Sequence, residues 1–134
     1  MKKLSWFILL FCLLILTSFA ASGQDQAGKP KIFFPKESWD FGKVAPGTLQ
    51  HTFAIKNLGD AELTVYAYPS CRVCISPELS RNNIPPKGRA KLFVKLYANY
   101  SGEHEAYAMI QSNDPDQPVI KIVVKAFVVS GEKK

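Results

Sequence analysis

The sequence predicts an all-β protein, an antiparallel β-sandwich that follows an N-terminal signal peptide. From Lys31 onward, apolar and polar residues alternate with a period of two, which is typical of strands that bury one face. Residues that favour turns separate the alternating runs, and no segment with a helical period is longer than about two turns. Short strands separated by turns indicate a β-sandwich.

Residues 1–23 have the layout of a secretory signal peptide. Two lysines, Lys2 and Lys3, precede an unbroken apolar run at residues 6–16, and small residues follow up to Gly23. A membrane-spanning helix needs roughly 20 apolar residues, and the run nearly reaches that length when it is extended into the small residues. We therefore expect a secreted or periplasmic protein, with retention of the segment as a membrane anchor as the alternative.

The rest of the chain is expected to form one domain. Residues 24–30 are small and polar and predict a disordered lead-in, and residues 31–130 carry the sandwich. The full chain has a formal net charge of +6, but its basic residues are scattered and form no run. Dispersed charge of this kind gives no reason to expect nucleic acid as a partner.

Five alternating runs predict the principal strands. They are residues 51–57, 61–68, 89–97, 105–112 and 119–129. In the run at 89–97, for example, Leu92 and Val94 share one face while Lys91 and Lys95 share the other. The apolar face of each run is therefore expected to point into the core.

Turn signals lie between these runs. The sequence NLGD at residues 57–60 predicts a short hairpin connection, and PPKG at residues 85–88 precedes a strand. The sequence NDPDQP at residues 113–118 predicts a turn. Asp114 and Asp116 in this segment could bind calcium, but the ligand spacing of known calcium loops is absent, so a plain turn is favoured.

Several motifs occur in a specific order from Trp39 to Val128. They are SWDFGKVAPG, HTFAIKNLGDAELTV, a pair of nearby cysteines, IPPKGRAKLFV and IQSNDPDQPV. In this order they resemble the secreted bacterial Ig-like family of unknown function, which is related to the Hydin-like and major-sperm-protein-like Ig domains. The resemblance implies an Ig-like antiparallel sandwich of about seven strands, usually behind a signal peptide, and it implies no established chemistry.

The cysteine pair departs from the family pattern. Members of this family usually carry Ser-Cys-Gly-Cys-Thr, whereas Arg72 and Val73 separate Cys71 from Cys74 here. Any role that depends on the tighter spacing is therefore not carried over to this chain. The third cysteine, Cys12, lies inside the apolar run and would leave with the signal peptide.

After export, Cys71 and Cys74 would be the only two thiols. An oxidising compartment favours a disulfide between them, which would staple a loop and contribute about 2 kcal/mol before strain is subtracted. Thiol–disulfide exchange is a second interpretation, because Arg72 would lower the pKa of a neighbouring thiol. However, no helix is expected after Cys74, and dithiol oxidoreductases usually place their motif at the start of a helix.

Metal binding is the third interpretation of the cysteines. Thiolates select Cu(I) or zinc, and two-coordinate copper could bind the two sulfurs alone. A closed zinc site needs four ligands, for which His51 and His104 are the remaining candidates. The pattern places His51 at the rim of the core and His104 at a solvated position beside a hairpin turn. No cofactor is expected, with copper as the exception.

Tyrosines and lysines predict an interaction surface. Tyr66, Tyr68 and Tyr107 have the parity opposite to the core positions of their strands, and the final strand adds Lys121 and Lys125. In an Ig-like sandwich these strands are neighbours, so the side chains would share one outer face. Exposed aromatic rings bordered by charge suit contact with a protein or a glycan.

The sequence therefore favours a binding module without catalytic activity. No serine lies in a nucleophile elbow and no pair of carboxylates has a convincing cleft, so the partners that acid–base catalysis needs are missing. The expected partner is a protein or glycan of the cell envelope, with membrane contact only if the N-terminal segment is retained. The alternative is a small envelope copper-binding or thiol–disulfide protein that uses Cys71 and Cys74.

Overall fold

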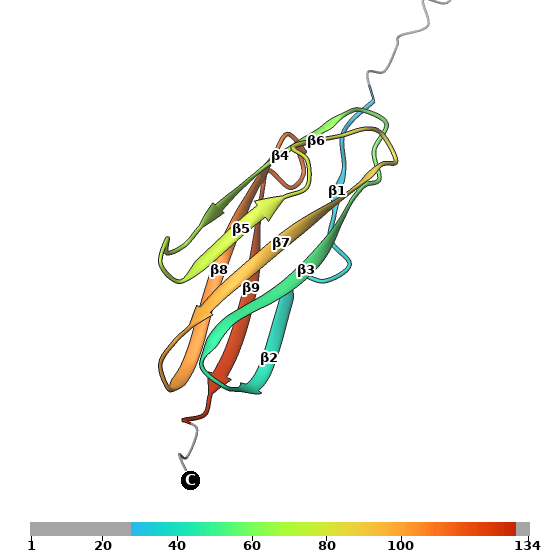
Figure 1. The fold of residues 1–134 in the computed structure, drawn as a ribbon. Helices are drawn as coiled ribbons and strands as arrows, with labels where there is room; N and C mark the ends of the chain where they lie inside the picture. The colour runs from blue at the N-terminus through green and yellow to red at the C-terminus, as the bar shows by residue number, and fades with distance from the viewer. Residues whose placement is uncertain (1–27, 131–134) are drawn as a thin grey trace, which may run out of the picture.

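The computed structural model describes residues 28–130. It contains nine strands: β1 (Ile32–Phe33), β2 (Ser38–Val44), β3 (Gly47–Asn57), β4 (Leu63–Pro69), β5 (Ile75–Leu79), β6 (Asn83–Ile84), β7 (Arg89–Ala98), β8 (Gly102–Ser112) and β9 (Val119–Val128) (Figure 1). The predicted signal peptide lies outside the described residues, as does most of the predicted lead-in. Of the lead-in, Lys29 is described, and its carbonyl accepts a hydrogen bond of 3.0 Å from the amide of Asp60.

The strands form two sheets that pack face to face. Sheet A has the order β1-β3-β7-β5, and sheet B has the order β2-β9-β8-β4-β6. All pairs are antiparallel except β2 with β9, which are parallel. The prediction of an Ig-like sandwich is confirmed, and β1 and β6, of two residues each, bring the strand number above seven. Residues 28–130 include no helix that is long and apolar enough to cross a bilayer.

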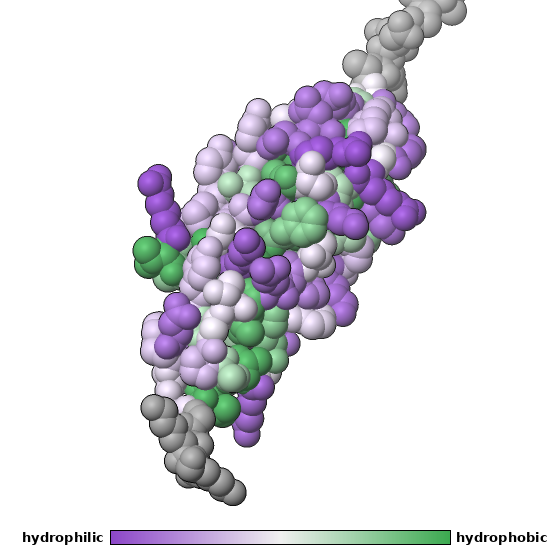
Figure 2. All heavy atoms as spheres, in the orientation of Figure 1, coloured by the Kyte–Doolittle hydropathy of each residue, from purple (hydrophilic) through white to green (hydrophobic). Residues whose placement is uncertain are grey.

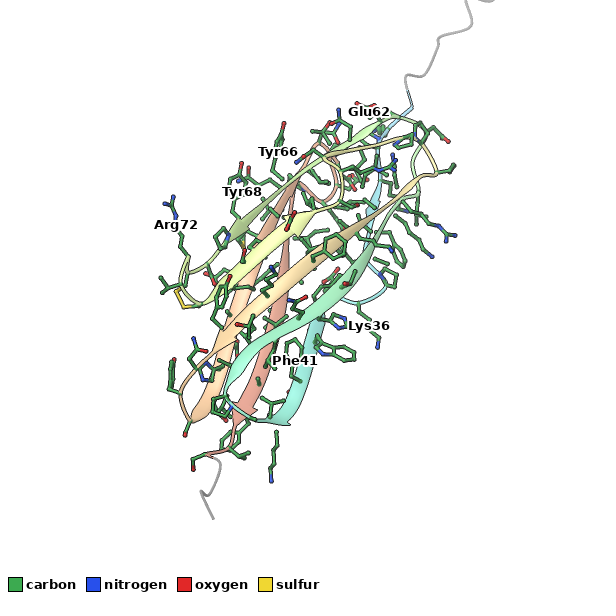
Figure 3. The ribbon with its side chains drawn as sticks, in the orientation of Figure 1. Lys36, Phe41, Glu62, Tyr66, Tyr68 and Arg72 are labelled. Atoms are coloured by element: carbon green, nitrogen blue, oxygen red, sulfur yellow. A yellow bond between two sulfur atoms is a disulfide. The ribbon has the colours of Figure 1, made fainter. Side chains whose placement is uncertain are left out.

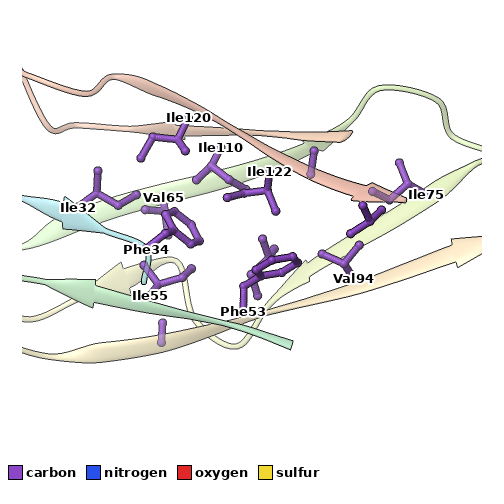
Figure 4. Packing of buried hydrophobic residues seen from close by; sticks show 14 of the residues in the cluster. Ile32, Phe34, Phe53, Ile55, Val65, Ile75, Val94, Ile110, Ile120 and Ile122 are labelled. Carbon is purple, nitrogen blue, oxygen red and sulfur yellow. The ribbon is translucent and has the colours of Figure 1, made fainter. Parts of the chain in front are cut away.

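The core lies between the sheets and is built from the alternating residues that the sequence predicted. In β7, Leu92 and Val94 are buried while Lys91 and Lys95 are exposed. Ile110 of β8 and Ile122 of β9 meet the sheet A side chains from the opposite layer (Figure 4). Burial of these apolar surfaces is the main favourable term for the fold, at roughly 25 cal/mol per Å² removed from water.

The connection at residues 57–60 is not the hairpin that was predicted. β3 lies in sheet A, whereas β4 lies in sheet B, so the chain crosses between the sheets here. The side chain of Asn57 holds this crossing, because its Nδ2 donates to the carbonyls of Ala61 (2.8 Å) and Ile84 (3.1 Å). Its Oδ1 accepts from the amide of Lys31 at 3.2 Å. The same turn residues serve a hairpin and a crossing, so the local pattern did not distinguish them.

β5 was not among the predicted strands, because a proline lies at its centre. The amide of Ser80 donates to the carbonyl of Lys91 on β7 at 2.9 Å. Because strand residues alternate in direction, Glu78 also faces β7 and Pro77 faces away from it. A proline at this position removes no hydrogen bond from the ladder, which is why an edge strand tolerates it.

The turn predicted at residues 113–118 is confirmed as the link between β8 and β9. Asp114 is buried, and its Oδ2 accepts from the amide of Ile32 at 2.9 Å. Its Oδ1 accepts from the amide of Asp116 at 2.8 Å. The carboxylate therefore holds both the turn and β1 in place, a role that the sequence pattern did not indicate.

Candidate functional site

The predicted tyrosines and lysines lie on the outer face of sheet B, because β4, β8 and β9 are consecutive strands of that sheet. We call Tyr66, Tyr68, Tyr107, Lys121 and Lys125 the tyrosine face. The side chains of Tyr66 and Tyr68 are 51% and 47% exposed. Both project away from the ribbon, on the same side of the molecule as Arg72, which lies in residues 70–74, the cysteine loop (Figure 3).

Two charge contacts order the lysines of this face. The Nζ of Lys121 lies 4.2 Å from the centre of the Tyr107 ring, a cation–π geometry. The Nζ of Lys125 lies 3.4 Å from a carboxylate oxygen of Glu105, which is the residue directly opposite on β8. Both members of this ion pair are largely exposed, so the pair contributes little to stability. Lys125 is therefore paired, while Tyr66 and Tyr68 remain available.

A shallow groove runs beside the two exposed tyrosines. It has a volume of about 190 Å³ and is lined by Tyr66, Tyr68, Pro77, Leu79 and Asn82, among others. Pro77 and Leu79 come from β5 in sheet A, so the groove lies where the edges of the two sheets approach each other. The contribution of β5 to this groove was not predicted, because Pro77 argues against a strand at residues 75–79.

Cys71 and Cys74 form the predicted disulfide, which lies on a surface bend between β4 and β5 (Figure 3). The carbonyl of Cys71 accepts from the amides of Cys74 and Ile75, both at 3.1 Å, so a tight turn brings the sulfurs together. Arg72 and Val73 at the tip are exposed. In the bonded form neither sulfur is a thiolate, and Cu(I) binding needs thiolates.

The cysteine loop adjoins the tyrosine face. The amide of Ser70, the residue before Cys71, donates to the carbonyl of Tyr107 at 2.9 Å. The amide of Tyr107 in turn donates to the hydroxyl of Ser70 at 3.1 Å. The start of the loop is thus fixed to β8 beside one of the three tyrosines.

His51 occupies the rim of the core on β3 and stacks on a tryptophan. Its ring lies 3.9 Å from that of Trp39 with an interplanar angle of 10°, and it meets the edge of Phe53 at 4.7 Å. Burial lowers the pKa of His51, and the nearby Lys36 ammonium lowers it further. The imidazole therefore favours its neutral form in the fold.

The prediction that His104 is a solvated residue beside a hairpin turn is wrong. It lies on β8, is 6% exposed, and its Nε2 is 2.7 Å from the carbonyl oxygen of Tyr100. A carbonyl only accepts, so Nε2 carries the proton and has no free lone pair for a metal. The two candidate histidines belong to different sheets, since His51 is on β3. Within residues 28–130, no group of three or more potential ligands is arranged to hold a metal ion.

The two-sheet topology and the disulfide-stapled bend define an Ig-like β-sandwich module that presents an aromatic outer face. The chain belongs to the family described as "Protein of unknown function (DUF1573)", which it matches over residues 32–128. This confirms the resemblance that the sequence motifs indicated. A comparison with curated proteins finds no match.

Solved structures support the fold. A protein of unknown function from Porphyromonas gingivalis W83 is 22% identical with a TM-score of 0.64, over 82% of this chain and 51% of that one. This chain therefore spans about half the length of that protein. The ASH/PapD-like domain 7 of human CEP192 is 11% identical with a TM-score of 0.60, over 78% of this chain and 89% of that one. At these identities the likeness concerns the fold alone.

Proposed function

We propose that the chain is a secreted or periplasmic interaction module without catalytic activity, which binds a protein or glycan of the cell envelope through its tyrosine face. The observation that carries the proposal is the exposure of Tyr66 and Tyr68 next to the Tyr107–Lys121 contact. Tyrosines offer a large apolar surface together with a hydroxyl, and they are enriched among the residues that dominate binding energies. The groove beside them supplies a concave surface for a partner.

The test is a pull-down from envelope fractions with the double variant Tyr66→Ala/Tyr68→Ala. Its matched control is Phe93→Ala, because Phe93 is an aromatic residue of similar exposure (40%) on sheet A. We expect the double variant to lose the partner while Phe93→Ala retains it, with unchanged thermal unfolding for both. Equal recovery by wild type and the double variant would contradict the proposal. Recovery that survives protease treatment of the fraction identifies a glycan.

A second candidate function rests on the disulfide at an exposed bend. A bridge that flanks the exposed Arg72 and Val73 is accessible to an attacking thiolate, as a thiol–disulfide partner requires. Mass measurement of the purified protein, with and without reductant and alkylation, separates the candidates. A two-hydrogen deficit that reductant reverses supports the disulfide, and free thiols with a stoichiometric metal support a copper carrier instead. An alkylatable Cys74 in a trapped mixed disulfide with an envelope protein would favour exchange.

A further inference from the structure

β3 has one edge along which its backbone groups face away from the rest of sheet A. The amide of Asn57 donates to the carbonyl of Gly88 just before β7, and the register between β3 and β7 is continuous from there to Gly47. Because residues of an antiparallel strand alternate in direction, the odd-numbered residues of β3 bond to β7. The N–H and C=O groups of the even-numbered residues, from Thr48 to Ala54, therefore point outward.

No strand among the described residues covers this edge at residues 48–54. The sheet ends on this side with β1, which pairs only with Lys56 and Asn57. If β1 continued in the same register, Pro35 would lie opposite Ala54 and would have to donate an N–H that proline lacks. The chain leaves sheet A at this point and enters sheet B as β2.

The open edge lacks the features that usually protect an edge strand. Its outward side chains are Thr48, Gln50, Thr52 and Ala54, which are all exposed and uncharged. Natural edge strands are commonly protected by lysines, prolines, bulges or short length. A regular stretch of exposed strand without any of these is suited to pairing with an added strand.

The two surfaces beside this edge differ in chemistry. The strands of sheet A carry a basic excess, with the basic residues Lys56, Arg89, Lys91 and Lys95 against the single acidic residue Glu78. The outer face of this sheet, which faces the viewer in Figure 2, is accordingly dominated by hydrophilic atoms in its upper half. On the other side of the edge, toward β2, the partly buried Trp39, Phe41, Val44 and Leu49 pack against the core, and His51 stacks on one face of Trp39.

We propose that the open edge of β3 binds an extended segment of a partner protein in which acidic side chains alternate with apolar ones. Such a segment would add to sheet A as a further strand, bonding to the outward groups of residues 48–54. Its acidic side chains would face the lysines of β7, about 10 Å or two strand spacings away. Its apolar side chains would pack on Trp39 and Phe41. Because side chains of one strand alternate between faces, one short segment can satisfy both surfaces.

Charge decides between this partner and a second copy of the chain. In a pair of copies joined edge to edge, two basic outer faces would be placed side by side, and β3 has no acidic residue to offset them. An acidic segment instead brings opposite charge within reach of the lysines. Interactions over about 10 Å are partly screened at physiological ionic strength, so the binding should weaken with added salt. The site is also separate from the tyrosine face, as Lys36 and Phe41 lie on the side of the molecule away from Tyr66 and Tyr68 (Figure 3).

The test uses a fluorescent peptide of alternating glutamate and valine that is long enough to span residues 48–54. We expect its anisotropy to rise on titration with the protein, and a matched peptide of alternating lysine and valine to bind at least about tenfold more weakly. Hydrogen exchange locates the site, since the amides of Gln50 and Thr52 should exchange rapidly in the free protein and become protected with the peptide. Equal binding of the acidic and basic peptides, or protection elsewhere, overturns the proposal.

Variants complete the test. Thr52→Pro removes an outward N–H without touching the bonds to β7, and it should weaken binding of the acidic peptide by about tenfold. Lys91→Gln/Lys95→Gln, with exposed side chains that the fold does not need, should weaken binding and reduce its salt dependence. The control Tyr66→Ala/Tyr68→Ala should bind as wild type does. If Thr52→Pro and Lys91→Gln/Lys95→Gln both bind the acidic peptide with unchanged affinity, the proposal is contradicted. A free protein that is dimeric, with Gln50 and Thr52 already protected, identifies a second copy as the occupant instead.

Discussion

The sandwich has two sides on which edge strands of sheets A and B lie next to each other. The unpaired backbone groups of these edge strands are protected differently on the two sides. On the β4–β5 side, the outward amide of Val65 donates to the carbonyl of Asn82 at 2.8 Å, and that of Ile75 donates to Cys71. Pro69 and Pro77 occupy further outward positions and have no amide to offer. The few outward amides that remain on β4 and β5 are separated from one another, so they cannot form the row of hydrogen bonds that an added strand needs.

On the β2–β3 side, the outward positions of β3 have no such partners among the described residues. β2 itself is irregular, because its register with β9 shifts between Asp40 and Lys43 and Gly42 has a φ of 72°. The Oδ1 of Asp40 accepts from the amide of Gly42 at 2.8 Å, which stabilises the bulge. β2 is therefore protected by a bulge and by charge, while the neighbouring edge of β3 is regular and uncharged.

This difference shows that the chain protects its strand edges selectively. Among residues 28–130, prolines, a disulfide-linked loop and a bulge protect three of the sheet edges, and the β3 edge at residues 48–54 has no such protection. A proline or a lysine at one position is enough to protect an edge, so the absence of protection from β3 is not imposed by the fold.

Asn57→Ala removes a side chain that bonds both to Lys31, next to β1, and to Ile84 of β6. It should lower the free energy of unfolding by about 3 kcal/mol or more, because several buried backbone groups would lose their partner. Denaturant unfolding measures this directly. Asn113→Ala, which removes an amide that bonds at an exposed site, is the control and should cost less. A loss below that of the control would mean that water replaces the bonds of Asn57.

Cys71→Ser/Cys74→Ser should affect the β4–β5 side alone. Removing a bridge across so short a loop should lower the free energy of unfolding by at most about 2 kcal/mol. Hydrogen exchange should then be faster at Ile75 and Tyr97, whose amides bond to the carbonyls of the two cysteines, and unchanged along β3. Faster exchange along β3 as well would show that the two sides are coupled through the core.

His51 should make the β2–β3 side sensitive to pH. Its pKa is lower in the folded chain than in the unfolded chain, so the unfolded state takes up the proton first as the pH falls. The stabilisation is complete above a pH of about 6.5, the ordinary pKa of histidine, and it is lost as the pH falls through the folded value. His51→Phe keeps a ring against Trp39 and should lose less stability than wild type between pH 8 and pH 5. Equal losses of stability in wild type and His51→Phe would mean that other groups cause the pH dependence.

Pro77→Val should turn the protected edge into one that resembles β3. Because Pro77 faces away from β7, the change in unfolding free energy should stay within about 0.5 kcal/mol. The new outward N–H should however increase self-association, measured by light scattering at rising protein concentration. Scattering identical to that of wild type would show that one added amide does not open this edge.

The sequence predicted the faces of the strands well and their partners less well. Alternation placed residues such as Leu92 and Ile122 in the core, because burial follows the local period. Sheet membership depends on contacts between distant segments, so the crossing at residues 57–60 was mistaken for a hairpin. β5 was missed because Pro77 argues against a strand unless its outward direction is known.

The candidate site was predicted in the same uneven way. Parity alone placed Tyr66 and Tyr68 on the outer face, and the disulfide was favoured by the expected oxidising compartment together with the short spacing of the two cysteines. The burial of His104 was missed, because its flanking glutamates suggest a solvated strand and the contact with Tyr100 is made by a backbone carbonyl. The open edge of β3 carries no local signal, since it results from the end of β1 at Phe33, two residues before Pro35.

The parallel pairing of β2 with β9 has a mechanical consequence. The described segment before β1 and the end of β9 lie at opposite poles of the molecule, and β2 and β9 both run toward the pole at the end of β9 (Figure 1). Tension between the poles would load the hydrogen bonds of this pair simultaneously, in shear, instead of breaking them one after another. We expect the module to resist stretching more strongly along this axis than when it is pulled across β4 and β8, which single-molecule force measurements can compare.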